Sequence, residues 1–214
     1  MDLFEFRRDY MIGGLRRNDL NDNPIIQFEQ WLNEIVQFGT VDPTAMVLAT
    51  VDTQQRPHQR IVLLKKVDQD GFVFFTNKDS DKAIDIKNNA EVGLHFPWHA
   101  AERQVKVNGV AAALSFEDSQ EYFHRRPRES QLAAVASAQS KPLTSRQQLM
   151  EQYSLAQSQY PESIPMPKNW GGYRVAPHMM EFWQGGEHRL HDRFVYKRAN
   201  ARAESEWSIQ RLSP

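Results

Sequence analysis

The most constraining feature of the sequence is a series of short apolar runs between residues 45 and 114, each rich in Val, Ile, Leu or Phe. Such runs are typical of β-strands, which favour β-branched and aromatic side chains. Polar, turn-like stretches at residues 52–57 and 68–71 separate the first three runs. The sequence therefore predicts strands over residues 45–51, 58–67, 71–76, 91–98 and 102–114, arranged as an antiparallel meander and most simply closed into a barrel.

Segments of helical character flank these strands. Asn23 and Pro24 are typical of a helix N-terminus, and the apolar stripe that follows ends at Gly39, so a core-packing helix is expected between them. Ser115 begins another helix, which Pro127 must end or kink. Further helices are expected over residues 80–89, 129–138 and 145–160, and further strands over residues 170–176, 179–183, 192–198 and 206–212. The predicted fold class is α+β, mainly antiparallel β with peripheral helices.

Composition argues against several classes of function. The chain has no cysteine, which excludes disulfides, thiolate metal sites and cysteine nucleophiles and fits a reducing, cytoplasmic location. Its formal net charge of −1 argues against a general nucleic-acid binder. No apolar run approaches the roughly 20 residues of a membrane span. We expect one domain over residues 23–214, preceded by an arm over residues 1–22 whose basic part is either a frayed terminus or a flap over an anionic ligand.

Three polar clusters are candidates for binding anions. In the strand at residues 60–66, alternation puts Arg60, Val62, Leu64 and Lys66 on one face and Ile61, Leu63 and Lys65 on the other, although its cations could simply extend to solvent at a barrel rim. Residues 76–82 join a strand end to a helix start, which favours a phosphate. Lys82 adds charge there and Asp81 opposes it.

The third cluster spans the break at Pro127 and consists of Tyr122, Arg126, Arg128 and Ser130. A phenol, guanidinium groups and a hydroxyl that converge would bind a phosphate monoester well. Another polar helix end follows at residues 138–141. Gln104 is an amide among apolar neighbours, either a core residue or a hydrogen-bond partner for a heterocycle.

Residues 181–193 look like a functional site rather than scaffold. An aromatic pair runs into a Gly-Gly hinge, and then two His, two Arg and two acidic residues follow with one apolar residue, Leu190. A solvated turn is the alternative. A metal site on His188 and His191 is disfavoured, because a hairpin would turn these side chains apart.

Taken together, these motifs closely resemble the pyridoxine/pyridoxamine 5′-phosphate oxidase family. The likeness covers residues 7–214 and is carried by residues 60–65, Phe75-Thr76, Gln104, residues 122–130, Gln139-Ser140 and, above all, the sequence WQGGEHRLHDR at residues 183–193. The resemblance implies a homodimeric split β-barrel with FMN at the subunit interface, residues 170–214 contributing to the site and to dimerisation. It also implies oxidation of pyridoxamine or pyridoxine 5′-phosphate to pyridoxal 5′-phosphate, with O2 as acceptor and H2O2 as product.

The resemblance also implies roles for individual residues. FMN would be held by Arg60, Ile61, Val62, Leu63, Leu64, Lys65, Phe75, Thr76, Lys82, Gln104, Gln139, Ser140, Trp183 and Arg193. Arg189 and His191 would be catalytic, and the substrate would also contact Arg7, Tyr10, Lys65, Tyr122, Arg126, Ser130 and Leu190. No metal is implied.

The sequence leaves open the strength of FMN binding, the presence of a further anion site and the possibility of a non-catalytic protein. The family usually has Arg at the position of Asp81, so weaker FMN retention is expected unless Lys78 compensates. Arg16, Arg17 and Arg211 could form an additional anion site, although solvated arginines are the simpler interpretation. A non-catalytic flavin- or haem-binding module on the same barrel is the main alternative. Such a module would not need a second phosphate set or the pair Arg189 and His191.

Overall fold

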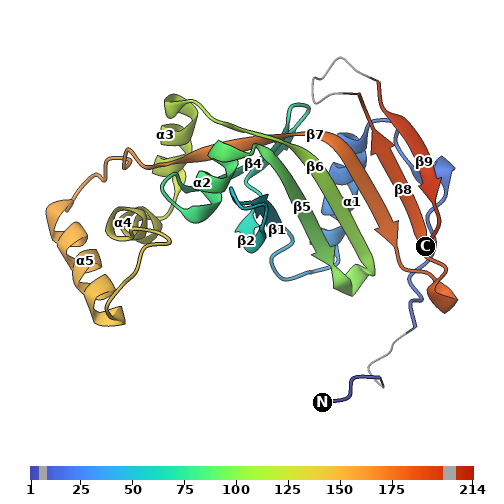
Figure 1. Ribbon diagram of the computed structural model, residues 1–214, viewed down its shortest axis with the longest axis horizontal. Coiled ribbons are helices and arrows are strands. Elements are labelled where there is room, and N and C mark those ends of the chain that lie inside the picture. Colours follow the sequence, from blue (N-terminus) through green and yellow to red (C-terminus); the bar gives the residue numbers. More distant parts are fainter. Residues whose placement is uncertain (5–8, 200–205) are drawn as a thin grey trace.

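The computed structural model describes residues 1–4, 9–199 and 206–214. Its main feature is a 9-stranded antiparallel sheet (Figure 1). The strands are β1 (Ala45–Val51), β2 (Pro57–Leu63), β3 (Lys66–Asp68), β4 (Gly71–Asn77), β5 (Glu91–Trp98), β6 (Arg103–Ala113), β7 (Trp170–Gln184), β8 (Asp192–Lys197) and β9 (Ser208–Leu212). The order along the main path is β2-β1-β5-β6-β7-β4-β3, and β8 and β9 extend from β7.

The prediction of a simple meander is wrong, because β4 pairs with β7 rather than with β5. The helix between β4 and β5 carries the chain across to the other part of the sheet. The predicted strand over residues 58–67 is also interrupted after Leu63, where the Lys65 N–H donates to the Val73 carbonyl at 2.8 Å. This bond links the end of β2 to β4 and curls the sheet toward closure.

The expected break between residues 176 and 179 is wrong as well, since β7 runs without interruption through Pro177. The register between β6 and β7 shifts between Asn108 and Gly109, opposite Pro177. A β-bulge tolerates a proline that cannot donate to the ladder. Gly109 is required there, because a Cβ would lie 2.4 Å from the Ala176 carbonyl oxygen.

The helices form where the capping signals predict them. Side chains of Asn23, Ser115 and Ser145 each accept a backbone N–H within the first helical turn, at 2.9, 2.9 and 3.1 Å. These bonds satisfy donors that a helix start leaves unpaired. The helices are α1 (Pro24–Gln37), α2 (Asp81–Asn88), α3 (Phe116–Arg125), α4 (Arg128–Ala136) and α5 (Arg146–Gln159). Within the described residues, none of them is long and apolar enough to cross a membrane.

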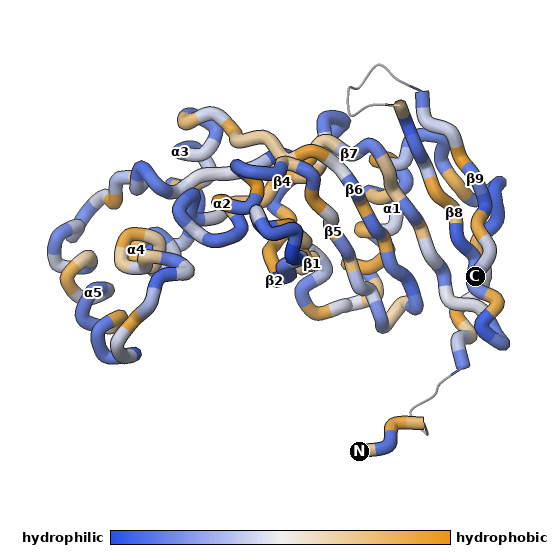
Figure 2. Tube along the Cα trace, viewed as in Figure 1, coloured by the Kyte–Doolittle hydropathy of each residue, from blue (hydrophilic) through white to orange (hydrophobic). Residues whose placement is uncertain are grey.

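Two apolar clusters hold the molecule together. The larger one lies between α1 and the curled sheet and includes Phe28, Phe72 and Phe96, all fully buried. The smaller one joins α3, α4 and α5 to the start of β7 through Phe123 and Trp170. Figure 1 shows these three helices as a lobe beyond one end of the sheet, and Figure 2 shows the apolar segments concentrated in the central strands.

Candidate functional site

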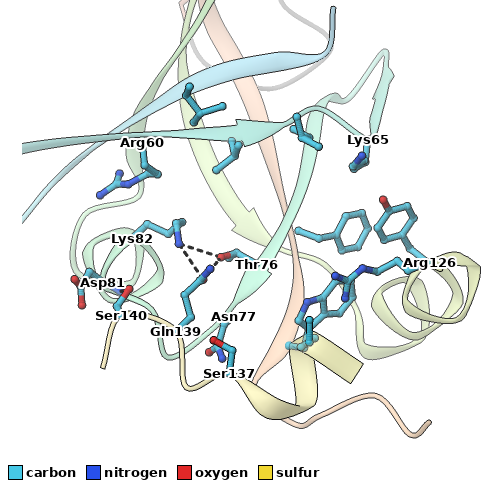
Figure 3. A pocket seen from close by; sticks show the side chains of 18 residues that line it. Arg60, Lys65, Thr76, Asn77, Asp81, Lys82, Arg126, Ser137, Gln139 and Ser140 are labelled. Atoms are coloured by element: carbon cyan, nitrogen blue, oxygen red, sulfur yellow. Dashed lines mark hydrogen bonds between the residues drawn. The ribbon is translucent and has the colours of Figure 1, made fainter. Parts of the chain in front are cut away.

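A cavity of about 700 Å³ lies where the helical lobe meets the sheet (Figure 3). It gathers many of the residues singled out from the sequence: Arg60, Ile61, Val62, Leu63, Lys65, Phe75, Thr76, Lys82, Tyr122, Arg126, Gln139 and Ser140. Asn77, Asp81, Ala133, Ala134, Ser137 and Trp170 complete its lining. β2, β4, α2, α3 and α4 therefore all contribute to one cavity.

Lys82 is fixed at one end of this cavity. Its Nζ lies 3.0 Å from Gln139 Oε1 and 3.2 Å from both Thr76 Oγ1 and Ser80 Oγ, and the side chain is buried. Burial, and after it the neighbouring charge of Arg60, lowers the pKa of Lys82, while Asp81 opposes this shift. A buried ammonium held by neutral oxygens is well placed to bind an anion.

Arg60 lies beside Lys82 at the same end (Figure 3). Its Nη1 donates to Thr50 Oγ1 at 2.7 Å, and its Nη2 lies 3.8 Å from a carboxylate oxygen of Asp85. Burial lowers the pKa of Arg60, and the charges of Asp85 and Asp81 partly offset this shift. Nη1 thus fixes the side chain against β1 while the guanidinium borders the cavity.

Arg126 lies toward the opposite end, with Lys65 labelled on the same side in Figure 3. Its guanidinium sits over the Trp170 ring at 4.8 Å, and burial lowers its pKa. Among the described residues, its buried Nη1 has no hydrogen-bond partner. An unsatisfied buried charged donor is destabilising by itself, about 1–3 kcal/mol or more. An anionic ligand at this end would supply the missing acceptor.

Three stacked aromatic rings line the cavity near Arg126. Phe75 stacks on Tyr122 with ring centroids 4.0 Å apart and on Trp170 at 5.3 Å. Burial raises the pKa of Tyr122, so its hydroxyl is a donor at neutral pH. Trp170 was not predicted as a site residue, because an aromatic residue at a strand start resembles any core residue.

Some predicted site residues do not line the cavity. Leu64 directly follows the end of β2, and its side chain is buried in the main core at 4% exposure. Ser130 lies in the first turn of α4, outside the cavity lining. Arg128 donates instead to the carbonyl oxygens of Glu162, at 3.0 Å, and Tyr160, at 2.5 Å, so it ties α4 to the segment after α5.

The loop after β7 forms a second, separate region. A 3₁₀ turn (Glu187–Arg189) connects Gly186 to β8, and His188 and Arg189 both have positive φ, 53° and 64°. This conformation is costly for residues other than glycine and often occurs at functional sites. Arg189 and Leu190 are exposed. The loop thus presents a guanidinium and an apolar side chain to the outside of the chain.

His191 is held in one orientation within this loop. The Gly186 N–H donates to His191 Nδ1 at 3.2 Å, so the neutral ring carries its proton on Nε2. Burial, and then the charge of Arg189, lowers the pKa of His191. The ring packs against Trp183 at 4.6 Å and edge-on against Tyr10 at 5.3 Å between centroids. These contacts bring the arm, the end of β7 and the loop together.

Two further predicted FMN contacts lie near the same strand end. Arg193 makes a bidentate pair with Glu181, at 3.0 and 3.1 Å, and this bonding raises the pKa of the guanidinium. Gln104 lies opposite Trp183 in the β6–β7 register, and its Oε1 is 2.9 Å from His95 Nε2. Both side chains are therefore held by their own chain.

The structure does not bring all the predicted site residues together within one chain. Gln104, Trp183, Arg189, Leu190, His191 and Arg193 do not line the cavity. Neither does Lys78, so it gives the cavity no replacement for a missing cation. Arg7 lies outside the described residues. Of the arginines considered as a further anion site, Arg17 pairs with Asp22 and Arg211 with Asp192.

Fold and cavity together define the class of this protein. It is a split barrel with a cleft that has cations toward both ends and stacked aromatic rings near Arg126, which suits flat ligands carrying phosphate groups. The class agrees with the α+β split barrel expected from the sequence.

Comparison with known proteins identifies the family. Residues 32–156 match the family "Pyridoxamine 5′-phosphate oxidase", and residues 170–214 match "Pyridoxine 5′-phosphate oxidase C-terminal dimerisation region". The pyridoxine/pyridoxamine 5′-phosphate oxidases of Vibrio campbellii and Teredinibacter turnerae are each 53% identical to this chain, over 100% of both sequences. The chain belongs to the pyridoxine/pyridoxamine 5′-phosphate oxidase family, as its motifs indicate, and is an enzyme of that family.

Solved structures confirm the fold. PhzG from Burkholderia lata in complex with tetrahydrophenazine-1-carboxylic acid has a TM-score of 0.87 at 26% identity, covering 94% of this chain and 98% of that protein. A pyridoxamine 5′-phosphate oxidase-related, FMN-binding protein from Nostoc punctiforme has a TM-score of 0.70 at 16% identity, covering 87% of this chain and 97% of its own. The second likeness concerns the fold alone.

Proposed function

We propose that this chain binds FMN in the cavity and oxidises pyridoxamine or pyridoxine 5′-phosphate to pyridoxal 5′-phosphate, with O2 as acceptor and H2O2 as product. The observation that carries the proposal is the buried, unpartnered Nη1 of Arg126, which lies across the cavity from Arg60 and Lys82. Cations at two ends suit two ligands that each carry a phosphate. When bound, FMN would accept a hydride from C4′ of the substrate.

The residues at the first end fit the phosphate of FMN. Lys82 and Arg60 supply buried positive charge, and the start of α2 supplies backbone N–H groups. Ser140 lies beside this helix start, with its Oγ 3.3 Å from the Asp81 nitrogen. The exposed edge of β2, with Ile61 and Leu63, would border the flat ring system. The donor set therefore suits a phosphorylated flavin.

The residues at the second end fit the substrate phosphate. Arg126 has the free donor, Tyr122 has a protonated hydroxyl next to it, and Lys65 is an exposed cation at the rim. Ser130 belongs to this proposed set through its motif alone, since it does not line the cavity. Fixing both phosphates would hold the two rings at reacting distance, roughly 3–3.5 Å.

The loop residues would act on the cavity of a second chain in a homodimer. The match to the dimerisation region over residues 170–214 supports such a dimer. So do the exposure of Arg189 and Leu190 in the loop and the 72% exposure of Ile61 at the cavity rim. In this arrangement Arg189 would stabilise developing charge, and His191 would orient the substrate through Nε2–H. Gln104, Trp183 and Arg193 would contact FMN from the same side.

Anaerobic mixing of the FMN-loaded protein with each phosphorylated vitamer tests this proposal. We expect the flavin absorbance to bleach with at least one of them, and to return with formation of H2O2 when oxygen is admitted. A flavin that neither vitamer phosphate bleaches would instead favour a non-catalytic binding module on the same fold.

A further inference from the structure

Glu102 connects the N-terminal arm to the barrel. It follows the 3₁₀ turn His99–Ala101 between β5 and β6 and is buried at 6% exposure. Its Oε2 accepts the backbone N–H groups of Met11, at 2.8 Å, and Ile12, at 3.0 Å. Hydrogen bonds to an ionised carboxylate are about twice as strong as neutral ones. The carboxylate therefore fixes the backbone of the arm at two consecutive residues.

The backbone of Glu102 contacts the end of β7 in the same chain. Its carbonyl oxygen accepts the Gly185 N–H at 2.8 Å and the Gln184 Nε2 at 3.2 Å. Glu102 has a φ of 53°, in the left-handed region that is unfavourable for a residue with a side chain. That conformation lets a single residue bind the arm with its side chain and β7 with its backbone.

Fixing Met11 and Ile12 also fixes Tyr10. The Tyr10 ring lies against Gly185, where a Cβ would come within 2.7 Å of it, so only glycine leaves room for the ring. From there the ring contacts Trp183 and His191 edge-on, at 5.7 and 5.3 Å. The arm therefore restricts the position of the His191 ring.

A second carboxylate holds the arm farther along. Asp192 Oδ2 accepts the Leu15 N–H at 2.8 Å. Asp192 directly follows His191 in the loop, so replacing it would disturb the loop itself. Glu102 lies on a different hairpin, and its replacement tests the arm without altering the loop sequence.

We infer that Glu102 is a positioning residue, whose carboxylate holds the arm so that Tyr10 fixes the His191 ring. This inference rests on the proposed function, in which His191 contacts the substrate. Glu102 itself touches neither substrate nor cofactor; it acts through Met11, Ile12 and Tyr10.

The test combines amide hydrogen exchange with steady-state kinetics on the FMN-loaded full chain. The variants are Glu102→Ala, which removes the acceptor, and Glu102→Gln, which keeps one acceptor oxygen without the charge. Glu34→Gln is the matched control: Glu34 pairs with Arg103, the residue after Glu102, and within the described residues it makes no hydrogen bond to the arm. Peptides covering residues 9–14 report the Met11 and Ile12 amides directly.

We expect Glu102→Ala to expose both amides to exchange at least about tenfold faster, because their acceptor is lost. KM for the vitamer phosphate should rise about tenfold, with a smaller change in kcat, because the His191 ring that orients the substrate is no longer fixed by Tyr10. Glu102→Gln should fall between Ala and wild type, and Glu34→Gln should match wild type. A variant that merely loosened the β5–β6 turn would lower Tm without this selective change in exchange and KM.

Other outcomes overturn the inference. Wild-type exchange and KM in Glu102→Ala would show that the carboxylate does not hold the arm. Faster exchange with an unchanged KM would show that the arm is held without consequence for the substrate. If the Ala variant does not fold, Glu102→Gln replaces it: wild-type exchange and KM in that variant would show that the charge of the carboxylate does not hold the arm. Absence of turnover in the wild type would overturn the proposed function instead. Amide hydrogen exchange would still show whether Glu102 holds Met11 and Ile12.

Discussion

The cavity and the loop after β7 are built in opposite ways, although both carry cations. In the cavity, Arg60 and Lys82 are largely buried and hydrogen-bonded within their own chain. In the loop, Arg189 and Leu190 are exposed, and the backbone of Arg189 is in the left-handed region. The cavity is thus organised by the fold of one chain, whereas the loop is shaped to reach a surface outside it. This contrast explains why neither region alone resembles a complete active site.

The two regions also store free energy differently. Burial lowers the pKa of Arg60, Lys82 and Arg126, which means that the fold bears a desolvation cost that a bound anion would reduce. In the loop, the positive φ at His188 and Arg189 costs about 1–3 kcal/mol at each residue. An anionic ligand would relieve the first cost, while the second must be offset by contacts such as those of the arm.

The largest effect should come from the loop. Arg189→Met should lower kcat/KM, because the transition state would lose roughly 2–4 kcal/mol of stabilisation, the range seen when other electrostatic stabilisers are removed. FMN binding should change little, because the proposed contact of Arg189 across the dimer is with the substrate rather than with FMN. Steady-state kinetics with both vitamer phosphates and an FMN titration measure the two quantities. Unchanged turnover would remove the role proposed for Arg189.

The next effect should come from the second end of the cavity. Arg126→Met should weaken substrate binding by about 1.5–3 kcal/mol, the usual range for a hydrogen bond to a charged group. The change should fall mainly on KM, since a phosphate clamp acts before and during the reaction alike. Arg128→Met is the control, because Arg128 donates to backbone carbonyls and not to the cavity. Arg128→Met should lower Tm with little change in KM. If Arg128→Met raised KM and Arg126→Met did not, Arg128 rather than Arg126 would bind the substrate phosphate.

A smaller effect should appear in the pH profile through His191. Because burial and the charge of Arg189 lower its folded-state pKa from 6.5, the ring is mostly neutral at pH 7 and should become protonated as the pH falls below 6.5. Protonation puts a proton on Nδ1, which can then no longer accept the Gly186 N–H. We expect kcat/KM to be flat above pH 6.5 and to fall up to about tenfold per pH unit below the lowered pKa.

The same linkage affects stability in the same direction. The unfolded chain binds the His191 proton more readily than the folded chain, so this group destabilises the fold as the pH drops below the unfolded pKa. His191→Gln should flatten the acidic limb of the kinetic profile. An acidic limb that persists in this variant would assign the titration to another group.

Most of the cavity could be predicted from the sequence, because its cations stand at local features. Lys82 follows a strand end and begins a helix, and Arg60 lies in a strand whose alternation is readable. The side chain of Leu64, placed in the site by resemblance, lies in the core instead. Alternation does not account for this, because Arg60 and Val62 would share its face and both line the cavity.

Other parts could not be predicted, because they depend on contacts between distant segments. The pairing of β4 with β7 is decided by the curl of the whole sheet, and the sequence pattern of each strand is compatible with either neighbour. Glu102 was missed for a related reason. Its partners are backbone N–H groups of the arm, and a backbone donor leaves no mark in the sequence.

The smallest effect should come from Asp81, an acidic residue among the cations of the cavity. Asp81 lines the cavity, and its charge raises the pKa of both Arg60 and Lys82. It therefore already stabilises these cations and would repel a phosphate bound to them. Asp81→Asn should tighten FMN binding by roughly 0.5–1 kcal/mol, about two- to fivefold, for a charge at a solvent-exposed rim.

Titration of the apoprotein by quenching of flavin fluorescence measures this affinity, at low and at high salt. The gain should shrink at high salt, since exposed charges are screened over about 8–10 Å at physiological ionic strength. Asp79→Asn is the matched control, because Asp79 lies two residues earlier and does not line the cavity. Equal gains in both variants would indicate a general change in charge. Weaker binding in Asp81→Asn would mean that the carboxylate orients Arg60 and Lys82 rather than competing with the phosphate.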